Sequence, residues 1–133
     1  MILLDTHALV WMDQNMPALG ENARQIIQNA WDAHAVAVGA ISFWECAMLH
    51  KARRLELPAS SNRWRMELLE AGLIEIPIDG ATAMLAVSLD LLHKDPADRL
   101  ITATAIARNA TLITADAKIL QWVHPLKRHD ASI

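Results

Sequence analysis

Short apolar segments alternate with amphipathic stretches along the whole chain, and this alternation limits the fold more than any other feature. Runs of three or four apolar residues between polar residues are typical of buried parallel strands. They predict strands at residues 2–4, 35–38, 73–76 and 111–114. A weaker fifth strand is expected at residues 123–126, where Pro125 restricts it to an edge of the sheet.

The stretches between these runs have the periodicity of helices. Apolar residues in the segment 21–33 recur at the i, i+3, i+4, i+7 and i+8 positions of one helical face. Further helices are expected at residues 6–12, 42–54, 60–71, 81–92 and 96–109. Alternating strands and helices predict an α/β fold, here a three-layer α/β/α sandwich with a mostly parallel, twisted sheet, in one domain over residues 1–133. Functional sites of such folds lie beyond the carboxyl ends of the strands.

Four acidic residues are expected at that edge of the sheet. Asp5 directly follows the first strand, and Asp116 follows the fourth strand after one residue. Glu45 and Asp98 lie in the first turns of predicted helices. Four carboxylates at one edge repel one another, which raises their pKa values unless a cation is present. Clustered oxygen ligands suit Mg²⁺ or Mn²⁺, and ions held there can bind a scissile phosphate and activate water.

Each acid also has a structural interpretation. Residues 42–45 fit a capping box with Glu45 at the third helical position. Asp95 and Pro96 fit the start of another helix, and Asp98 in its first turn would interact favourably with the positive end of the helix dipole. Asp5 can cap a helix, and Asp116 can form a turn. No glycine-rich phosphate loop, serine-nucleophile elbow or zinc spacing offers another catalytic route. Three histidines are candidates for substrate contact: His7, His50 and His93.

The segments that carry the acids resemble the motifs of a known family. Residues 3–7 (L-L-D-T-H), followed by L-V-W at 9–11, resemble the start of a PIN-domain ribonuclease. Residues 42–45 (S-F-W-E) resemble its second motif, residues 93–99 (H-K-D-P-A-D-R) its third and residues 112–116 (L-I-T-A-D) its fourth. All four occur in the family's order, and the H-x-D-P-x-D-R form resembles the VapC toxins of bacterial type II toxin–antitoxin systems.

This resemblance implies an Mg²⁺- or Mn²⁺-dependent endoribonuclease that inhibits translation and growth until a VapB-type antitoxin binds it. It implies a homodimer that meets DNA only through its antitoxin. The acidic quartet carried over as catalytic and metal-binding residues is Asp5, Glu45, Asp98 and Asp116.

Further residues match positions near that quartet. Thr6 and Thr114 match hydroxyl positions close to the metal, and Arg99 matches a position for which a structural or a phosphate-orienting role is expected. Many relatives have an aromatic residue where this chain has Ala97, which alters local packing or the substrate groove without removing a carboxylate.

Apolar residues close to the acidic motifs allow two interpretations, core packing or an exposed antitoxin groove, because Trp and Met are enriched at interfaces. They are Trp11, Met12, Trp44 and Met48. The segment 81–92 carries more apolar residues than one buried helical face requires, which makes it a candidate dimer element.

The charge balance excludes one class of nucleic-acid-binding protein. Twelve basic and fifteen acidic residues give a net charge of −3, unlike a strongly basic, metal-independent RNA-coating protein. If four acids belong to a metal site, eleven remain against twelve bases, and Lys51, Arg53 and Arg54 can then guide a phosphate backbone.

A single cysteine, the absence of a 20-residue apolar stretch and an N-terminus without a basic region predict a cytoplasmic protein without a membrane span.

Three alternatives remain beside the ribonuclease. The first is a PIN domain that binds metal and RNA without cleavage, and the second is a nuclease that acts on DNA. The third is an α/β phosphotransfer protein with Asp5 as the phosphoacceptor. A haloacid-dehalogenase-type site requires a second Asp where this chain has His7, and a receiver-type site requires an acidic pair after the first strand.

Overall fold

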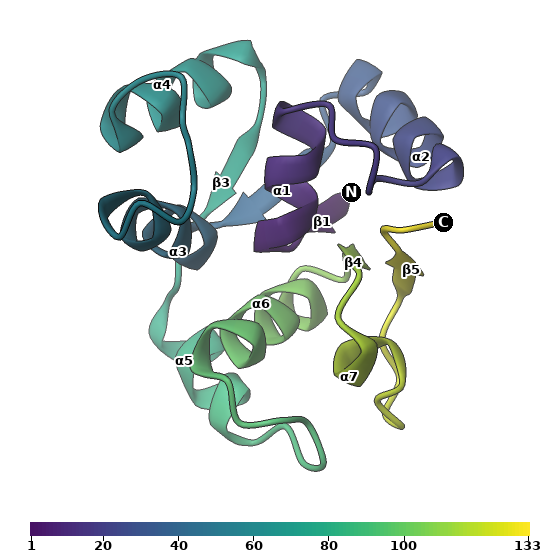
Figure 1. Ribbon diagram of the computed structural model, residues 1–133. Helices are drawn as coiled ribbons and strands as arrows, with labels where there is room; N and C mark the ends of the chain where they lie inside the picture. Colours follow the sequence, from purple (N-terminus) through teal and green to yellow (C-terminus); the bar gives the residue numbers. More distant parts are fainter.

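The computed structural model describes residues 1–133 as a five-stranded sheet between two layers of helices (Figure 1). The elements in chain order are β1 (Ile2–Leu4), α1 (Thr6–Asp13), α2 (Glu21–Asp32), β2 (Val36–Gly39), α3 (Ala40–Lys51), α4 (Ser61–Ala71), β3 (Ile74–Ile76), α5 (Gly80–Val87), α6 (Pro96–Ala107), β4 (Thr111–Thr114), α7 (Ala117–Leu120) and β5 (Arg128–Asp130). The predicted α/β/α sandwich is confirmed.

All strand pairs are parallel, and the strand order is β3-β2-β1-β4-β5. The first strand is therefore the central one, with Leu4 paired to Val38 of β2 on one side and to Ile113 of β4 on the other. The chain order reverses between β1 and β4. In parallel α/β sheets this reversal opens a crevice beyond the carboxyl ends of the two strands.

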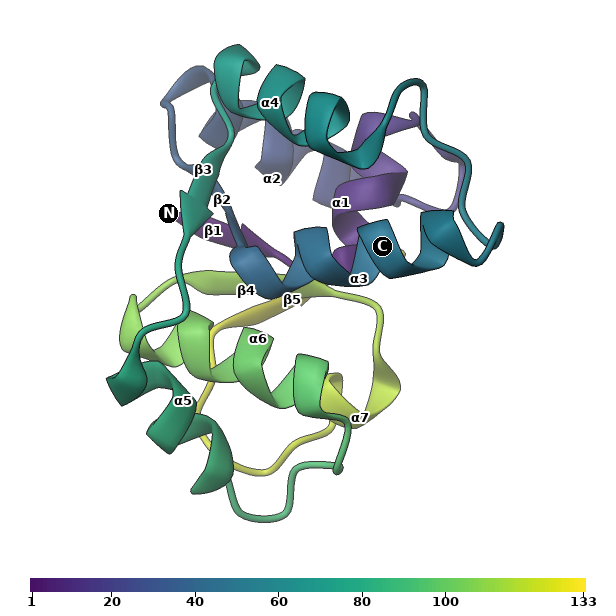
Figure 2. The ribbon, with the colours of Figure 1, turned by 90° about the vertical axis from the view of Figure 1, so that its left-hand side faces the viewer.

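Successive residues of β1 face opposite layers, as the two-residue period of a strand requires. Ile2 and Leu4 pack with α1 to α4, whereas Leu3 packs with α5 to α7. Figure 2 shows these two helical layers above and below the sheet. Leu3 and Leu4 are fully buried, so the short central strand is apolar on both faces. Burial on both faces explains its continuous apolar run.

The fifth strand lies at residues 128–130 and not at the predicted 123–126. It forms the edge of the sheet, paired in parallel with β4 through Leu112 and Arg128. Pro125 lies in the preceding loop, which suits a residue that lacks a backbone N–H for the ladder. The apolar run therefore indicated a strand at the wrong place, because this edge strand has the polar sequence R-H-D.

Two predicted helices differ from the observed ones by three residues or more at an end, and the others by one or two. The helix expected at 42–54 begins at Ala40 and ends at Lys51, and the helix expected at 81–92 ends at Val87. The segment that follows Val87 is irregular and includes Leu91 with a positive φ of 64°. No helix in the fold has both the length and the apolar character needed to cross a membrane.

Candidate active site

Asp5 directly follows the central strand, and its carboxylate links helix α1 to the end of strand β4. It is the N-cap of α1, and its Oδ1 accepts a hydrogen bond from the amide of Ala8 at 2.8 Å. Its Oδ2 accepts a hydrogen bond from the hydroxyl of Thr114, at the end of β4, at 2.5 Å. Only 4% of Asp5 is exposed. The capping interpretation of Asp5 is confirmed, yet it leaves a carboxylate buried in the crevice between β1 and β4.

Glu45 reaches the same crevice from the second turn of α3. The helix begins at Ala40 with Gly39 as its N-cap, so the predicted capping box that placed Glu45 at the third helical position is wrong. The Thr6 hydroxyl donates to Glu45 Oε1 at 2.5 Å and lies 3.0 Å from the hydroxyl of Ser42. Glu45 is therefore oriented by α1 rather than engaged with the start of its own helix.

Asp98 and Asp116 meet at the side chain of His93. Asp98 lies in the first turn of α6, and Asp116 caps α7 by accepting from two backbone amides through Oδ1. Their Oδ2 atoms lie 3.3 Å and 3.7 Å from His93 Nε2. The three potential ligand atoms all lie within 4.8 Å of one another. The structure thus unites residues of the third and fourth motifs, and it adds a histidine that the sequence marked only as a substrate-contact candidate.

Burial and mutual repulsion disfavour the charged forms of three of these acids. Desolvation raises the pKa of Asp5, with a smaller contribution from the negative charge of Asp116. Desolvation likewise raises the pKa of Glu45. The pKa of Asp98 rises to about 7, first because of burial and then because of the neighbouring carboxylates, beginning with Asp95. A cation would offset both causes, since it adds an opposite charge at the place where the carboxylates repel.

The raised pKa of Asp98 predicts a dependence of stability on pH in metal-free protein. Because folded Asp98 retains its proton to higher pH than the unfolded chain, unfolding free energy falls as pH rises from about 4 to about 7. Allowing for solvent screening of this partly exposed group, we expect Asp98→Asn to be more stable than wild type by about 1–2 kcal/mol at pH 8 and equal to it near pH 4.

Thermal melts across this pH range in the presence of a chelator measure the difference. Glu70→Gln, which removes an exposed carboxylate from α4, is the matched control and should leave the pH profile unchanged. A difference between Asp98→Asn and wild type that is constant with pH would contradict the assignment.

The other candidates for substrate contact differ in their surroundings. The Thr6 and Thr114 hydroxyls donate to Glu45 and Asp5, so they orient the carboxylates. All five N–H groups of Arg99 donate to backbone carbonyls, which leaves none for a phosphate and favours its structural role. The basic residues Lys51, Arg53 and Arg54 are exposed at the end of α3, two turns from Glu45.

Two lysines that were not selected from the sequence lie at the acidic site. Lys94 and Lys118 line a hollow of about 550 Å³ together with His93, Asp98 and Asp116. Lys94 lies within the third motif and Lys118 two residues after Asp116 of the fourth, so proximity to these motifs was the available signal. Their positions make them better candidates for a phosphate contact than Lys51, Arg53 and Arg54.

The four apolar candidates for an antitoxin groove separate into two kinds. Trp11 and Met12 are partly buried against the core, in accordance with the packing interpretation. Trp44 and Met48 are 54% and 47% exposed, and their spacing of four residues places them on one face of α3. The exposed pair is therefore available to a partner.

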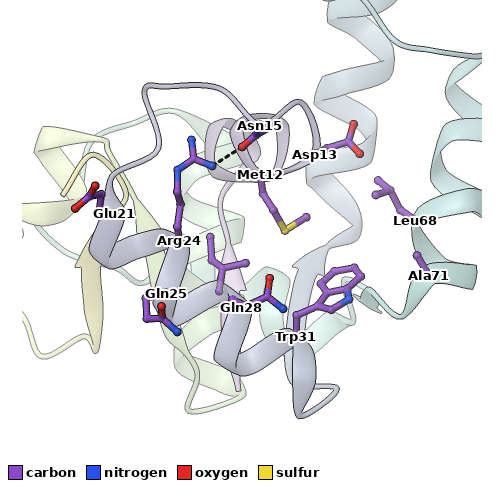
Figure 3. A pocket seen from close by; sticks show the side chains of 11 residues that line it. Met12, Asp13, Asn15, Glu21, Arg24, Gln25, Gln28, Trp31, Leu68 and Ala71 are labelled. Carbon is purple, nitrogen blue, oxygen red and sulfur yellow. Dashed lines mark hydrogen bonds between the residues drawn. The ribbon is translucent and has the colours of Figure 1, made fainter.

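A separate hollow of about 610 Å³ lies between α1, α2 and α4. Figure 3 shows Met12 and Trp31 pointing into it, with Leu68 on the opposite wall. Arg24 at its rim donates to Asn15 Oδ1 at 2.6 Å. Its lining is mixed, and it contains none of the four site acids.

The comparisons with known proteins agree with this geometry. The family model described as PIN domain matches residues 2–122. The chain belongs to the PIN-domain family. Ribonuclease VapC22 of Mycobacterium tuberculosis is 35% identical over 125 residues, which is 93% of this chain and 93% of that protein.

Solved structures share the PIN fold at lower identity. The crystal structure of VapBC2 from Rickettsia felis, bound to a DNA fragment from its promoter, matches with a TM-score of 0.72 and 20% identity over 97% of this chain and 98% of that one. DNA-bound VapBC from Salmonella typhimurium has a TM-score of 0.72 and 17% identity, with 98% of each chain covered. A toxin–antitoxin complex from Klebsiella pneumoniae has a TM-score of 0.67 and 22% identity, again with 98% of each chain covered. At these identities the matches establish the fold of this PIN domain.

Proposed function

We propose that this PIN domain is the toxin of a toxin–antitoxin pair, an endoribonuclease that depends on Mg²⁺ or Mn²⁺. The observation that carries the proposal is that Asp5, Glu45 and Asp116 lie close enough to Asp98 for their charges to raise its pKa, beyond the carboxyl ends of β1 and β4. A relative that is 35% identical over nearly the whole chain is a ribonuclease, which supports the same reaction class.

The residues present fit a divalent ion. Their donors are carboxylate oxygens, which Mg²⁺ and Mn²⁺ prefer, and His93 Nε2 is buried beside them without a hydrogen-bond partner. Asp5, Asp98 and Asp116 would hold the ion, with Glu45 as a further ligand or as the group that takes a proton from the attacking water. A bound ion would supply water activation and stabilisation of the leaving oxygen.

The protein's own contacts prepare these groups for that role. The Thr114 hydroxyl and the amide of Ala8 fix both oxygens of Asp5, and the Thr6 hydroxyl fixes one oxygen of Glu45. Lys94 and Lys118 border the acidic hollow, where they can neutralise the phosphates on either side of the scissile bond. The acids would hold the ion while the lysines hold the RNA backbone.

Sequencing of new RNA 5′ ends after a brief induction tests the proposed activity in cells. We expect discrete new 5′ ends and growth arrest with the wild-type chain, and neither with Asp98→Asn. An identical pattern of 5′ ends in the two strains would contradict the assignment of the site. RNA that co-purifies intact with both proteins would identify the alternative, a PIN domain that binds RNA without cleavage.

The antitoxin is proposed to cover the exposed face of α3 formed by Trp44 and Met48. Chains solved in VapBC complexes share this fold, and exposed Trp and Met residues are typical of interface centres. We expect Trp44→Ser to weaken antitoxin affinity about 30-fold while the melting temperature stays unchanged, since hot-spot aromatics contribute about 2 kcal/mol or more.

Isothermal titration calorimetry with the cognate antitoxin measures this change. Ile78→Ser alters an exposed apolar residue between β3 and α5 and serves as the control. If Trp44→Ser destabilises the fold and leaves the affinity unchanged, the core interpretation applies to this residue as well.

A second copy of the chain is the proposed partner of an apolar surface around α5. Met84, Val87 and Leu91 are between 73% and 80% exposed, and Val123, which is 74% exposed, lines one hollow with Leu91. Contiguous apolar surface of this kind marks an interface. We expect wild type to elute as a dimer in light-scattering chromatography and Val87→Glu as a folded monomer. A wild-type monomer at micromolar concentration would contradict this interface.

A further inference from the structure

His93 presents to the acidic site a ring nitrogen, Nε2, that makes no hydrogen bond within the fold. Its Nε2 is buried and makes no hydrogen bond in the fold, although Asp98 Oδ2 lies only 3.3 Å away. A buried polar atom without a hydrogen bond is unfavourable, because it has lost its water and gained nothing in return. This cost indicates that the nitrogen has a partner in the working protein.

Two side chains fix the position of His93 by donating to the backbone carbonyls of its segment. Arg99 Nη1 donates to the carbonyls of Leu92 and His93 at 2.9 Å and 3.2 Å. Trp122 anchors the same segment by donating from Nε1 to the carbonyl of Asp90 at 2.8 Å. These hydrogen bonds hold the irregular segment before α6 in one conformation, and that conformation places the imidazole beside Asp98 and Asp116.

The imidazole of His93 and the carboxylates of Asp98 and Asp116 form a mixed nitrogen and oxygen ligand set. Mg²⁺ prefers oxygen ligands only, whereas imidazole suits divalent transition-metal ions. All three ligand atoms lie within 4.8 Å of one another, which allows them to contact one ion after small side-chain rotations. The geometry thus distinguishes this site from a purely carboxylate centre.

We propose that His93 Nε2 is a direct ligand of the divalent ion and makes the site prefer Mn²⁺ over Mg²⁺. This inference rests on the proposed metal-dependent function and adds a nitrogen ligand to the acidic quartet. His93→Gln removes the imidazole. It should weaken Mn²⁺ binding about 10-fold or more, in the range for loss of a metal-supporting side chain, and weaken Mg²⁺ binding far less.

Pulsed electron paramagnetic resonance of the Mn²⁺-loaded chain tests the bond directly. We expect a ¹⁴N coupling in wild type, its replacement by a ¹⁵N coupling after labelling with ¹⁵N-histidine, and its loss in His93→Gln. His124→Gln removes an exposed histidine of the α7–β5 connection and should retain the coupling. Calorimetric titration with Mn²⁺ and Mg²⁺ gives the selectivity of each variant.

The outcomes separate this inference from the proposed function. Mn²⁺ that binds to wild type and is lost in Asp5→Asn, but shows no nitrogen coupling, overturns the role of His93 and leaves the metal-dependent nuclease in place. A wild-type chain that binds neither ion overturns both. If His93→Gln does not fold, the ¹⁵N-histidine coupling of His7→Gln decides the question, because His7 is another histidine at the site, whose charge acts on Asp5 and Glu45. A coupling that persists in His7→Gln supports His93 as the ligand, and one that is lost overturns it.

Discussion

Asp5→Asn is expected to reduce metal-dependent RNA cleavage about 100-fold or more while leaving the fold intact. Asp5 directly follows the central strand and is the most deeply buried of the four site acids, so the loss of its charge removes a central ligand of the proposed metal site. Cleavage of a cognate RNA in Mg²⁺ and in Mn²⁺, with protein from the same purification, measures the effect.

The stability of this variant separates a chemical effect from misfolding. Asparagine retains a carbonyl oxygen that accepts a hydrogen bond from the amide of Ala8. The substitution also removes a carboxyl group whose charged form is disfavoured by burial, as the raised pKa of Asp5 indicates. The variant should therefore melt at the wild-type temperature or above it in the absence of metal. Asp32→Asn, at the exposed end of α2, should retain full activity. Cleavage by Asp5→Asn within threefold of wild type would eliminate Asp5 as a metal ligand.

The layers and the positions of most elements could be predicted because they depend on local periodicity. The apolar pattern of a short buried strand, or of a helix with one apolar face, is contained within the segment itself. Asp5 and Asp116 could be placed at one edge for the same reason, since the carboxyl ends of neighbouring parallel strands coincide. The order of the strands confirms this reasoning for β1 and β4.

Features that depend on distant partners could not be predicted. The polar strand β5 exists because the edge of β4 offers it backbone hydrogen bonds, and its own side chains carry no apolar signal. Glu45 resembles a helix cap in sequence, but Thr6, 39 residues away, engages its carboxylate. The two carboxylates beside His93 likewise come from distant segments, α6 and the turn before α7.

Arg99 shows how the chain builds the irregular segment that carries His93. A sequence motif allowed either a phosphate contact or a structural role, because a guanidinium suits both. In the fold its Nε donates to Ala86, its Nη1 to Leu92 and His93, and its Nη2 to Val87 and Leu89. One side chain thus donates to five backbone carbonyls that accept no hydrogen bond within a helix or strand. The first two belong to Ala86 and Val87, the last residues of α5.

We therefore expect Arg99→Met to lower the unfolding free energy by about 3 kcal/mol, because several partly buried carbonyls lose a charged donor at once. Arg99→Lys should recover little of this loss, since a single ammonium group cannot span five acceptors. Arg108→Met, at the exposed C-cap of the same helix, is the matched control and should unfold like wild type in urea. An unfolding free energy of Arg99→Met within 1 kcal/mol of wild type would show that the segment is held by other contacts, and the positioning of His93 would then need a different origin.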